Sequence, residues 1–377
     1  MTDAPSPNFE IFLVTLPGLE DILLAEVREQ GFKKPKTISG GVLIQGGWPE
    51  VWRANLVLRG ASKVLARIGE LHAQNLKELE KNAEVFPWGA FLYPDCTIKV
   101  DVTTNKRNGV YHSGAAEERL ERAIAQAVSA KVTSDRAKVE VLVKARIVKN
   151  IVQISVDTSG VALHKRGYKQ ALGKAPLRET IAAMTLRACG YKRAEPLLDP
   201  MCGSGTYLIE AAEMAANLLA GRGRDFAFEK LVSYDADTVD KLKVDWFTRT
   251  PPTHFYGFDQ NGTVIKAAKD NAARAGVSEA CHFHAQPLSK LKRPDGPPGL
   301  VIVNPPYGTR ISNKKALYAL YRQFGDVMRA EFTGWRVGLV TSDDGLAQAT
   351  KLEWSNVSAP IPHGGLKIRL YRTEILG

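Results

Sequence analysis

The first 160 residues alternate strand-like apolar runs with segments of helical periodicity. Residues 9–15 are almost wholly apolar and predict a strand, whereas residues 20–30 repeat apolar side chains at helical spacing and stop at Gly31. Further strands are predicted at 38–44, 62–71, 96–103, 139–147 and 151–157, and further helices at 48–60, 75–84 and 114–131. Because strands and helices alternate in short units, we expect two small α+β domains, over 1–72 and 73–160.

From about residue 191 the pattern changes to apolar strands separated by amphipathic helices. Strands are predicted at 196–199, 254–258, 280–285, 299–303 and 335–341, and helices at 206–219, 263–275 and 315–332. This order is typical of a doubly wound α/β fold with a mostly parallel sheet. Segment 350–375 has strand character on both sides of Pro360 and predicts an antiparallel edge hairpin. Residues 221–253 match neither period and look like an insertion.

Length and composition are those of an ordinary globular protein. The chain has 377 residues, of which 44% are hydrophobic and 24% charged, which fits two or three domains and argues against disorder. The polar start lacks the basic and apolar regions of a secretion signal, and no apolar run reaches the ~18 residues of a membrane helix. The four cysteines form no CxxC or CxxH pair. We therefore expect a cytoplasmic protein without a membrane segment, a metal site or a disulfide framework.

The net charge of +11 and the pI near 9.4 suggest a polyanionic partner. Many basic proteins bind no nucleic acid, so the location of the charge matters more than its total. Residues 161–190, which connect the two halves, contain six Lys or Arg residues and one Glu and so carry +5 of the excess. This basic connecting segment is therefore a better argument for a phosphate-binding surface than the pI is.

A glycine-rich turn follows the first strand of the carboxy-terminal half, where the sequence reads LLDPMCGSGT from Leu197 to Thr206. Ligands of open α/β sheets bind beside such a turn. No third glycine follows at the spacing of a dinucleotide fold, and no P-loop lysine is present. Asp259, at the end of the second strand, can accept hydrogen bonds from both ribose hydroxyls of an adenosine; capping of the next helix is the alternative role.

The fourth strand ends in Asn304-Pro305-Pro306-Tyr307. An exocyclic amine attacks a sulfonium methyl group poorly because its lone pair is delocalised into the ring, and acceptors that hold its N–H groups free that lone pair. The Asn304 side-chain oxygen and the Pro305 carbonyl are two such acceptors, and neither proline has an N–H of its own. The Tyr307 ring offers a surface on which an unstacked base can lie. A plain Pro-Pro turn is the alternative, but the position after a buried strand and downstream of the glycine turn favours the chemical role.

Together these motifs resemble the bacterial THUMP-domain RNA methyltransferases, in particular the 23S rRNA guanine-N2 enzymes. The resemblance runs from Phe9 to Leu376, and its marks are LPGLE (16–20), SG (159–160), LHKRGY (163–168), LRET (177–180), DPMCGSG (199–205) and NPPY (304–307). It implies an amino-terminal ferredoxin-like domain and a THUMP domain that grips RNA. It also implies a Rossmann-like class I methyltransferase domain over 191–377, with a mostly parallel seven-stranded sheet and S-adenosyl-L-methionine as its cofactor.

The resemblance also assigns site residues, with Asn304 to Tyr307 at the target amine. The cofactor is expected at the glycine turn and the two strand ends that follow, at Asp199, Pro200, Cys202, Gly203, Ser204, Gly205, Thr206, Asp259, Gln260 and Gln286. Gln286 departs from the family, which usually has an acidic residue near the adenine. Some relatives carry a second methyltransferase domain, and because none follows Gly377 in this sequence we expect a single methylation.

Two clusters combine cations with ring-bearing side chains, as RNA-contacting segments do. The first lies in the basic connecting segment and comprises His164, Lys165, Arg166 and Lys169. The second lies in the expected THUMP domain and comprises Lys106, Arg107 and Tyr111. A solvated interdomain loop is the alternative for the first cluster, and a purely structural role is equally open for the second.

We expect a monomeric enzyme that methylates the exocyclic N2 of a guanosine in structured RNA, with 23S rRNA as the substrate and tRNA as the alternative. A non-catalytic RNA-binding ribosome assembly factor is the alternative from a different class. DNA adenine-N6 and protein glutamine-N5 methyltransferases share the NPPY loop, but the amino-terminal half of the chain argues against both.

Overall fold

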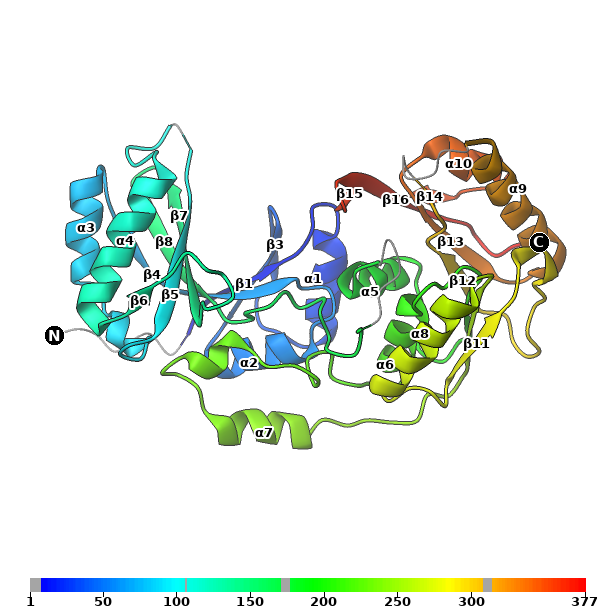
Figure 1. Ribbon diagram of the computed structural model, residues 1–377, viewed down its shortest axis with the longest axis horizontal. Coiled ribbons are helices and arrows are strands. Elements are labelled where there is room, and N and C mark those ends of the chain that lie inside the picture. Colours follow the sequence, from blue (N-terminus) through cyan, green and yellow to red (C-terminus); the bar gives the residue numbers. More distant parts are fainter. Residues whose placement is uncertain (1–7, 106, 171–176, 308–313) are drawn as a thin grey trace. The chain divides into compact units, whose positions relative to one another are not determined.

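The computed structural model describes residues 8–105, 107–170, 177–307 and 314–377 (Figure 1). The chain forms two compact units, each with its own β-sheet. The first unit comprises residues up to Thr15, Leu24–Leu163 and Arg224–Asp245, and the second comprises Leu16–Leu23, His164–Gly223 and Trp246–Gly377. Each unit is therefore assembled from separate stretches of the sequence.

The sheet of the first unit has the strand order β2-β3-β1-β4-β8-β7-β5-β6. Its strands are β1 (Phe9–Val14), β2 (Lys36–Ile38), β3 (Gly41–Gly46), β4 (Lys63–His72), β5 (Thr97–Thr103), β6 (Lys131–Val132), β7 (Val141–Val148) and β8 (Ile151–Asp157). β4 pairs antiparallel with β8 from Leu65 to His72, so the two predicted α+β domains share one continuous sheet. The single strand predicted at 38–44 is wrong, because a turn with Gly40 at φ +83° separates β2 from β3.

The helices of this half follow the predicted apolar periods. They are α1 (Glu20–Glu29), which begins in the second unit and ends in the first, α2 (Trp48–Val57), α3 (Leu76–Glu84) and α4 (Ser113–Val128). The Asn75 side chain accepts a hydrogen bond from the Glu78 amide and caps α3. α4 buries Ala116, Leu120 and Ile124, spaced by four residues, and lies beside α3 (Figure 1).

The predicted insertion at 221–253 contributes to the first unit. It holds a short 3-10 helix (Ala227–Lys230) and α7 (Ala236–Val244), which packs against α2. The Phe228 ring is fully buried and stacks on Phe226 at 4.9 Å, and the Phe228 amide donates to the Thr158 carbonyl. A stretch that lies inside the expected methyltransferase range therefore completes the core of the other unit.

The sheet of the second unit runs β11-β10-β9-β12-β13-β16-β14, and β15 pairs with β16 outside this line. Its strands are β9 (Leu197–Asp199), β10 (Phe255–Asp259), β11 (Cys281–Ala285), β12 (Leu300–Val303), β13 (Arg336–Thr341), β14 (Asn356–Val357), β15 (Ile361–His363) and β16 (Leu366–Arg372). The first five strands of the line are parallel, and β16 is antiparallel to β13, β14 and β15. The predicted mostly parallel sheet and its antiparallel edge are confirmed.

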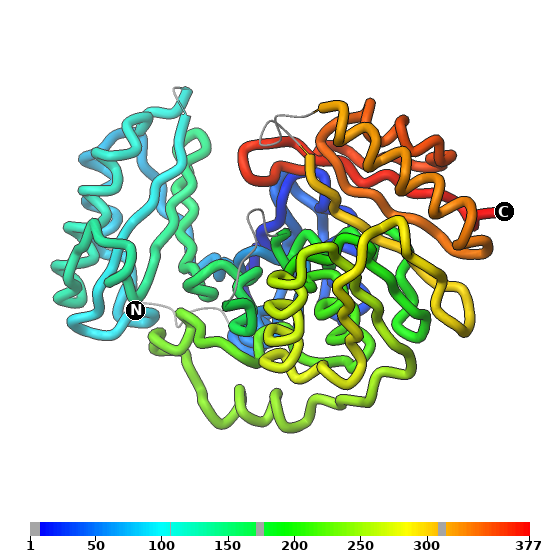
Figure 2. The backbone as a smooth tube through the Cα atoms, turned by 45° about the vertical axis from the view of Figure 1, so that its right-hand side comes forward, coloured from blue at the N-terminus to red at the C-terminus, as the bar shows by residue number. Residues whose placement is uncertain are grey.

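Among the residues that the structure describes, the helices that cover this second sheet are α5 (Glu179–Ala188), α6 (Thr206–Ala215), α8 (Gly262–Arg274), α9 (Lys314–Glu331) and α10 (Asp344–Ala349). α5, α6 and α8 lie on one side of the sheet and α9 and α10 on the other (Figures 1 and 2). On the second side, Tyr321, Phe324 and Met328 of α9 belong to the same buried hydrophobic cluster as Val301 and Val303 of β12. This is the doubly wound arrangement that the sequence predicts.

The described residues contain neither a candidate membrane-spanning helix nor a candidate metal site. None of the described helices is both long and apolar enough to cross a lipid bilayer. Within the same residues, no group of three or more His, Cys, Asp or Glu side chains is placed to hold a metal ion.

Candidate active site

The second unit has a cavity of about 490 Å³ at the carboxyl ends of three neighbouring strands. Asp199 ends β9, Asp259 ends β10 and Asn304 follows β12. β9 lies between the other two strands in the sheet, which is why residues so far apart in the sequence meet. The nine predicted site residues that line the cavity are Asp199, Cys202, Gly203, Ser204, Thr206, Asp259, Gln260, Asn304 and Pro306.

Asp199 lies at the bottom of this site, with an exposed fraction of 3%. Its carboxylate accepts a hydrogen bond from the Met201 amide at 3.0 Å. Burial, and secondarily the nearby Asp259 carboxylate, raise the pKa of Asp199 well above its usual range. A ligand that brings positive charge to this carboxylate would therefore be favoured there.

Asp259 is more accessible and holds the glycine turn. Its two oxygens accept hydrogen bonds from the amides of Gly203 (3.2 Å) and Asn261 (2.9 Å). The cap of α8 is Asn261, whose side chain accepts from the Thr263 amide, so the helix-capping alternative for Asp259 is wrong. The carboxylate borders the cavity, where it is placed to accept hydrogen bonds from ligand hydroxyls.

The two glycines of the turn have different roles. Gly203 has φ +50°, and a Cβ there would meet nothing within 4 Å. Gly205 has φ +84°, and a Cβ there would lie 2.9 Å from the Phe283 ring and 3.2 Å from Ala268. Gly203 therefore leaves the backbone open at the cavity, whereas Gly205 is required by packing against β11 and α8.

The loop after β12 places an unpaired acceptor in the cavity. The Asn304 Oδ1 atom is buried, and no described residue donates a hydrogen bond to it. The Pro306 carbonyl accepts a hydrogen bond from the Tyr321 hydroxyl at 3.3 Å, which fixes the loop to α9. Tyr307 is partly buried and packs against the core beneath α9, so only part of its ring is accessible to a base.

The remaining predicted residues of this region lie outside the cavity lining. Pro200 and Pro305 are buried, and the Gln286 side chain donates to the Lys290 carbonyl at 3.1 Å. Gln286 nevertheless stays next to the cavity, because its amide donates to the Asp259 carbonyl at 2.9 Å. Five lining residues escaped the sequence analysis: Leu177, Met201, Tyr207, Asn261 and Val264. Leu177 lay in the motif LRET, to which no role had been given, and Met201 lay in DPMCGSG, where the sequence analysis assigned its neighbours but not Met201 itself.

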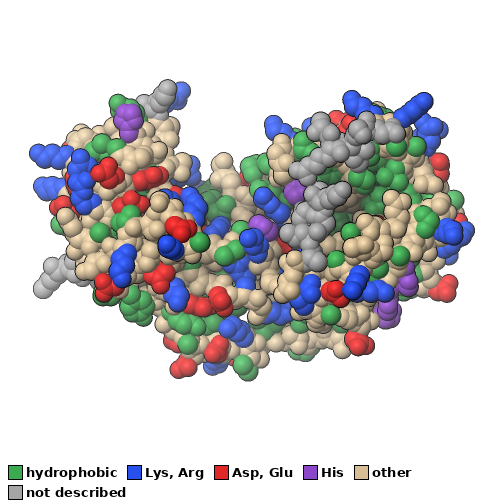
Figure 3. Space-filling view, viewed as in Figure 1, with side chains coloured by type: hydrophobic (Ala, Val, Ile, Leu, Met, Phe, Trp, Pro, Cys, Tyr) green, Lys and Arg blue, Asp and Glu red, His purple; other side chains and the backbone are tan. Residues whose placement is uncertain are grey.

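The basic connecting segment is only partly exposed. Lys165 is exposed and His164 half-buried, and burial together with the surrounding cations lowers the His164 pKa to about 4. Arg166 is 4% exposed and forms an ion pair with Glu210, and the Lys169 ammonium group is buried beside Glu179. Burial in ion pairs does not fit the predicted contacts of Arg166 and Lys169 with RNA phosphates. On the face drawn in Figure 3, Lys and Arg side chains are interspersed with Asp and Glu.

The second cluster predicted to bind RNA falls in the sequence that follows β5. Lys106 lies outside the described residues. Arg107 is exposed, and the Tyr111 side chain is 53% exposed with its ring 4.2 Å from that of His112. Arg107 and Tyr111 are therefore accessible to a partner, as the prediction requires.

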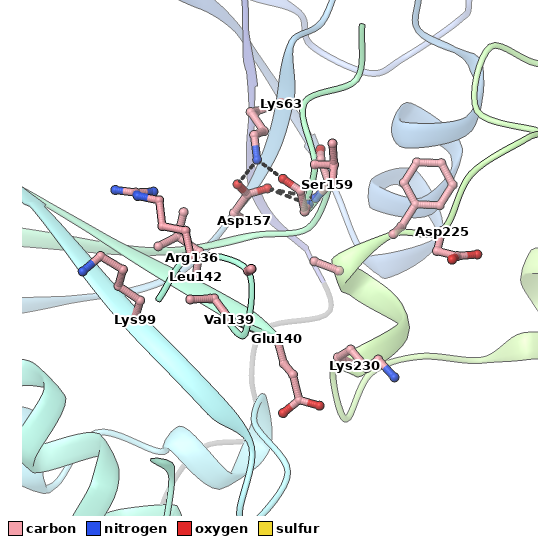
Figure 4. A pocket seen from close by; sticks show the side chains of 15 residues that line it. Lys63, Lys99, Arg136, Val139, Glu140, Leu142, Asp157, Ser159, Asp225 and Lys230 are labelled. Carbon is pink, nitrogen blue, oxygen red and sulfur yellow. Dashed lines mark hydrogen bonds and ion pairs between the residues drawn. The ribbon is translucent and has the colours of Figure 1, made fainter. Parts of the chain in front are cut away.

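A second cavity, also of about 490 Å³, lies within the first unit (Figure 4). Lys63 and Asp157 point toward one another in it and form an ion pair at 2.5 Å. Lys63 also donates to the Gly160 carbonyl, and Asp157 accepts from the Ser159 amide. Because these central charges are paired, we assign the chemistry to the cavity of the second unit.

Three family descriptions match consecutive parts of the chain. They are the RlmL ferredoxin-like domain over residues 10–65, the THUMP domain over 73–157, and the RMKL-like methyltransferase domain over 166–366. The last match covers more than half of the chain. The chain belongs to the RMKL-like methyltransferase family. The fold and the family expected from the motifs are thereby confirmed.

Relatives of this family agree with the assignment. The chain is 34% identical over 350 residues to the ribosomal RNA large subunit methyltransferase K/L of Aliivibrio salmonicida (strain LFI1238), across 90% of this chain and 50% of the relative. It thus spans about half the length of the curated relatives it matches. A possible methylase from Clostridium difficile 630 superposes with a TM-score of 0.87 at 27% identity, over 98% of this chain and 99% of that one. SMU.472, crystallised in complex with SAH, gives a TM-score of 0.85 at 25% identity, over 99% of both chains.

Proposed function

We propose that this protein transfers a methyl group from S-adenosyl-L-methionine to the exocyclic N2 of a guanosine in 23S rRNA. The observation that carries the proposal is the buried, unpaired Asn304 Oδ1 in the same cavity as the glycine turn and two carboxylates. A buried acceptor without a donor costs about 1–3 kcal/mol. Such an atom is expected where a substrate supplies the missing donor.

The residues around the cavity fit the proposed cofactor. The Asp259 carboxylate would accept from the ribose hydroxyls, and the open backbone at Gly203 leaves room for close approach. The buried Asp199 carboxylate, whose pKa burial raises, would be stabilised in its charged form by the positive charge of the bound cofactor. When bound, S-adenosyl-L-methionine supplies an electrophilic methyl group on sulfur. A structural neighbour of this chain was crystallised in complex with SAH, which supports this choice of ligand.

Asn304 has the central part in the transfer. Its Oδ1 would accept an N–H of the target amine and hold the nitrogen so that its lone pair faces the methyl group. The Pro305 carbonyl is the second expected acceptor. The Pro306 carbonyl is already tied to Tyr321 and keeps the loop in place. The partly exposed Tyr307 ring would cover one face of the base.

RNA would be held by the accessible members of the two predicted clusters. These are Arg107 and Tyr111 in the first unit and His164 and Lys165 in the second. The Arg107 and Lys165 cations would bind phosphates, and the Tyr111 ring would stack on an unpaired base. The relatives named ribosomal RNA large subunit methyltransferases favour rRNA as the substrate.

The proposal is tested by nucleoside mass spectrometry of 23S rRNA and tRNA from a deletion strain. The strain is complemented either with the natural protein or with the Asn304→Ala variant. We expect N2-methylguanosine to fall in 23S rRNA and to return only with the natural protein. Loss confined to tRNA would establish the tRNA alternative, and unchanged methylation of both RNAs would favour the non-catalytic assembly factor.

A further inference from the structure

Two cations of the basic connecting segment lie inside the second unit. The Arg166 guanidinium is 3.4 Å from Glu210 of α6, with side chains that are 2% and 0% exposed. The Lys169 ammonium is 3.3 Å from Glu179 of α5, with side chains that are 8% and 4% exposed. Groups enclosed to this degree act on their protein neighbours rather than on a partner in solvent.

The neighbours of Lys169 belong to the candidate active site. Its Nζ donates to the Thr206 hydroxyl at 2.8 Å and to the Leu177 carbonyl at 2.9 Å. Thr206 directly follows Gly205 and is the first residue of α6, and both Thr206 and Leu177 line the cavity. An ammonium group has three N–H donors. With Glu179 as the third partner, the three N–H groups link Lys169 to Leu177, to α5 and to the glycine turn.

A second set of contacts reaches the same turn from α8. The Asn271 side chain, fully buried, donates to the Ser204 carbonyl at 3.1 Å. Arg274 contacts the Asn271 oxygen and donates to the Tyr168 carbonyl at 2.7 Å. The residue next to Lys169 is thus joined through Arg274 and Asn271 to the turn. Ser204 and Thr206, the two neighbours of Gly205, are therefore both held by contacts that lead back to residues 168–169.

Burial of the Lys169–Glu179 ion pair costs free energy, because both charged groups lose their contact with water. Burial lowers the pKa of Lys169 and raises that of Glu179, and each partner counteracts the shift of the other. Buried ion pairs rarely stabilise a fold more than apolar side chains of the same size would, although removing one partner is costly. One reason for such a pair to be present is that it fixes the positions of the groups that are bonded to it.

We propose that Lys169 is a positioning residue for the cofactor: it holds the glycine turn from Gly203 to Thr206 in its binding conformation and does not contact RNA. This proposal rests on the proposed role of the turn in binding S-adenosyl-L-methionine. It assigns the LHKRGY and LRET motifs a common purpose, because Lys169 directly follows the first motif and Leu177 and Glu179 belong to the second.

The test is the dissociation constant of S-adenosylhomocysteine, measured by calorimetry without RNA on the full chain. Lys169→Met keeps the length of the side chain but removes its donors, and we expect the dissociation constant to rise about tenfold or more. The KM for RNA should stay within about twofold of the natural value at saturating cofactor. An unchanged dissociation constant together with a raised KM for RNA would overturn the proposal.

Arg222→Met is the matched control. Arg222 pairs with Glu213, a fully buried carboxylate on the same helix α6, and donates to the Ala275 carbonyl. It makes no hydrogen bond with the described residues of the turn. We expect this variant to lose thermal stability but to keep the cofactor affinity of the natural protein. Equal weakening by both variants would mean a general loss of stability and would overturn the proposal.

A double-mutant cycle keeps the proposal testable if Lys169→Met folds poorly. Thr206→Val removes the acceptor of the Lys169 bond while preserving the shape of the side chain, and Thr206→Ser retains the hydroxyl. We expect Thr206→Val to bind S-adenosylhomocysteine more weakly than Thr206→Ser, because only the serine keeps the acceptor of the Lys169 bond. The cycle is completed by Lys169→Arg alone and by Lys169→Arg/Thr206→Val. The double variant should bind no more weakly than Thr206→Val alone, since the shared bond is already lost. Additive effects would contradict the proposal. Failure of the natural protein to bind S-adenosylhomocysteine would instead refute the proposed function itself.

Discussion

Replacing Asn304 by alanine should separate activity from stability. In the structure the Asn304 Oδ1 atom is buried in the cavity, and no described residue donates a hydrogen bond to it. The substitution therefore breaks no hydrogen bond to Oδ1. An unpaired buried acceptor costs about 1–3 kcal/mol. We therefore expect the melting temperature of Asn304→Ala to equal or exceed that of the natural protein.

The same substitution should be severe for catalysis. Loss of one preorganised polar group from an active site reduces kcat about 10²-fold, which corresponds to about 2.7 kcal/mol of activation free energy. The assay is methyl transfer under single-turnover conditions, with saturating cofactor and RNA, so that binding and product release do not mask the chemical step. Affinity for S-adenosylhomocysteine should stay close to that of the natural protein.

Asn304→Asp is the matched control for this prediction. The aspartate side chain has the same shape and keeps an oxygen acceptor at the same place, so this variant should retain more activity than Asn304→Ala. Near-normal turnover in Asn304→Ala would refute the role assigned to the amide oxygen. A large fall in its melting temperature would show that the side chain has a structural partner instead.

Three further predictions concern the surroundings of the site. Asp259→Ala should weaken S-adenosylhomocysteine binding by about 1–3 kcal/mol, as expected for lost hydrogen bonds to a carboxylate, and an unchanged dissociation constant would contradict this. Gly205→Ala should lower the free energy of unfolding by about 1–3 kcal/mol, because residue 205 has φ +84° and a Cβ there would lie 2.9 Å from the Phe283 ring. Gly203→Ala, with nothing within 4 Å of its Cβ, should lose less stability, and equal losses would refute the packing argument. Because the folded-state pKa of His164 is lowered to about 4, the unfolded chain binds the proton first. Stability should thus fall as the pH drops from about 6.5 to about 4. In His164→Gln, the free energy of unfolding measured by urea denaturation should depend less on pH between about 6.5 and about 4. An equal pH dependence in the variant and the natural protein would contradict the assignment.

The sequence predicted best what depends on local periodicity. Apolar side chains repeat at strand or helical spacing through both halves, and most elements followed within a few residues. The two exceptions have different causes, one local and one long-range. A turn at Gly40 divides a run that resembles one strand. The short α7 packs on α2 of the first unit, a long-range contact that no periodicity within 221–253 reveals.

The candidate active site was predictable from the sequence because its residues are brought together by the topology of the sheet. Parallel strands bring their carboxyl ends to one edge of the sheet, so Asp199, Asp259 and Asn304 meet once the strand order is known. Burial of charge was not predictable. Arg166 and Lys169 resemble RNA-binding cations in the sequence, but their partners Glu210 and Glu179 neutralise them inside the second unit. Counting charges along a segment cannot detect pairs formed by folding.

The central claim is tested most directly by transfer of a labelled methyl group in vitro. The purified protein is incubated with S-adenosyl-L-methionine that carries a deuterated methyl group and with 23S rRNA from the deletion strain. The RNA is then digested to nucleosides and analysed by mass spectrometry. We predict that the label appears in N2-methylguanosine from 23S rRNA, and that it is about 10²-fold slower to appear with Asn304→Ala. Label in N6-methyladenosine, or no label with a protein that binds S-adenosylhomocysteine, would contradict the account.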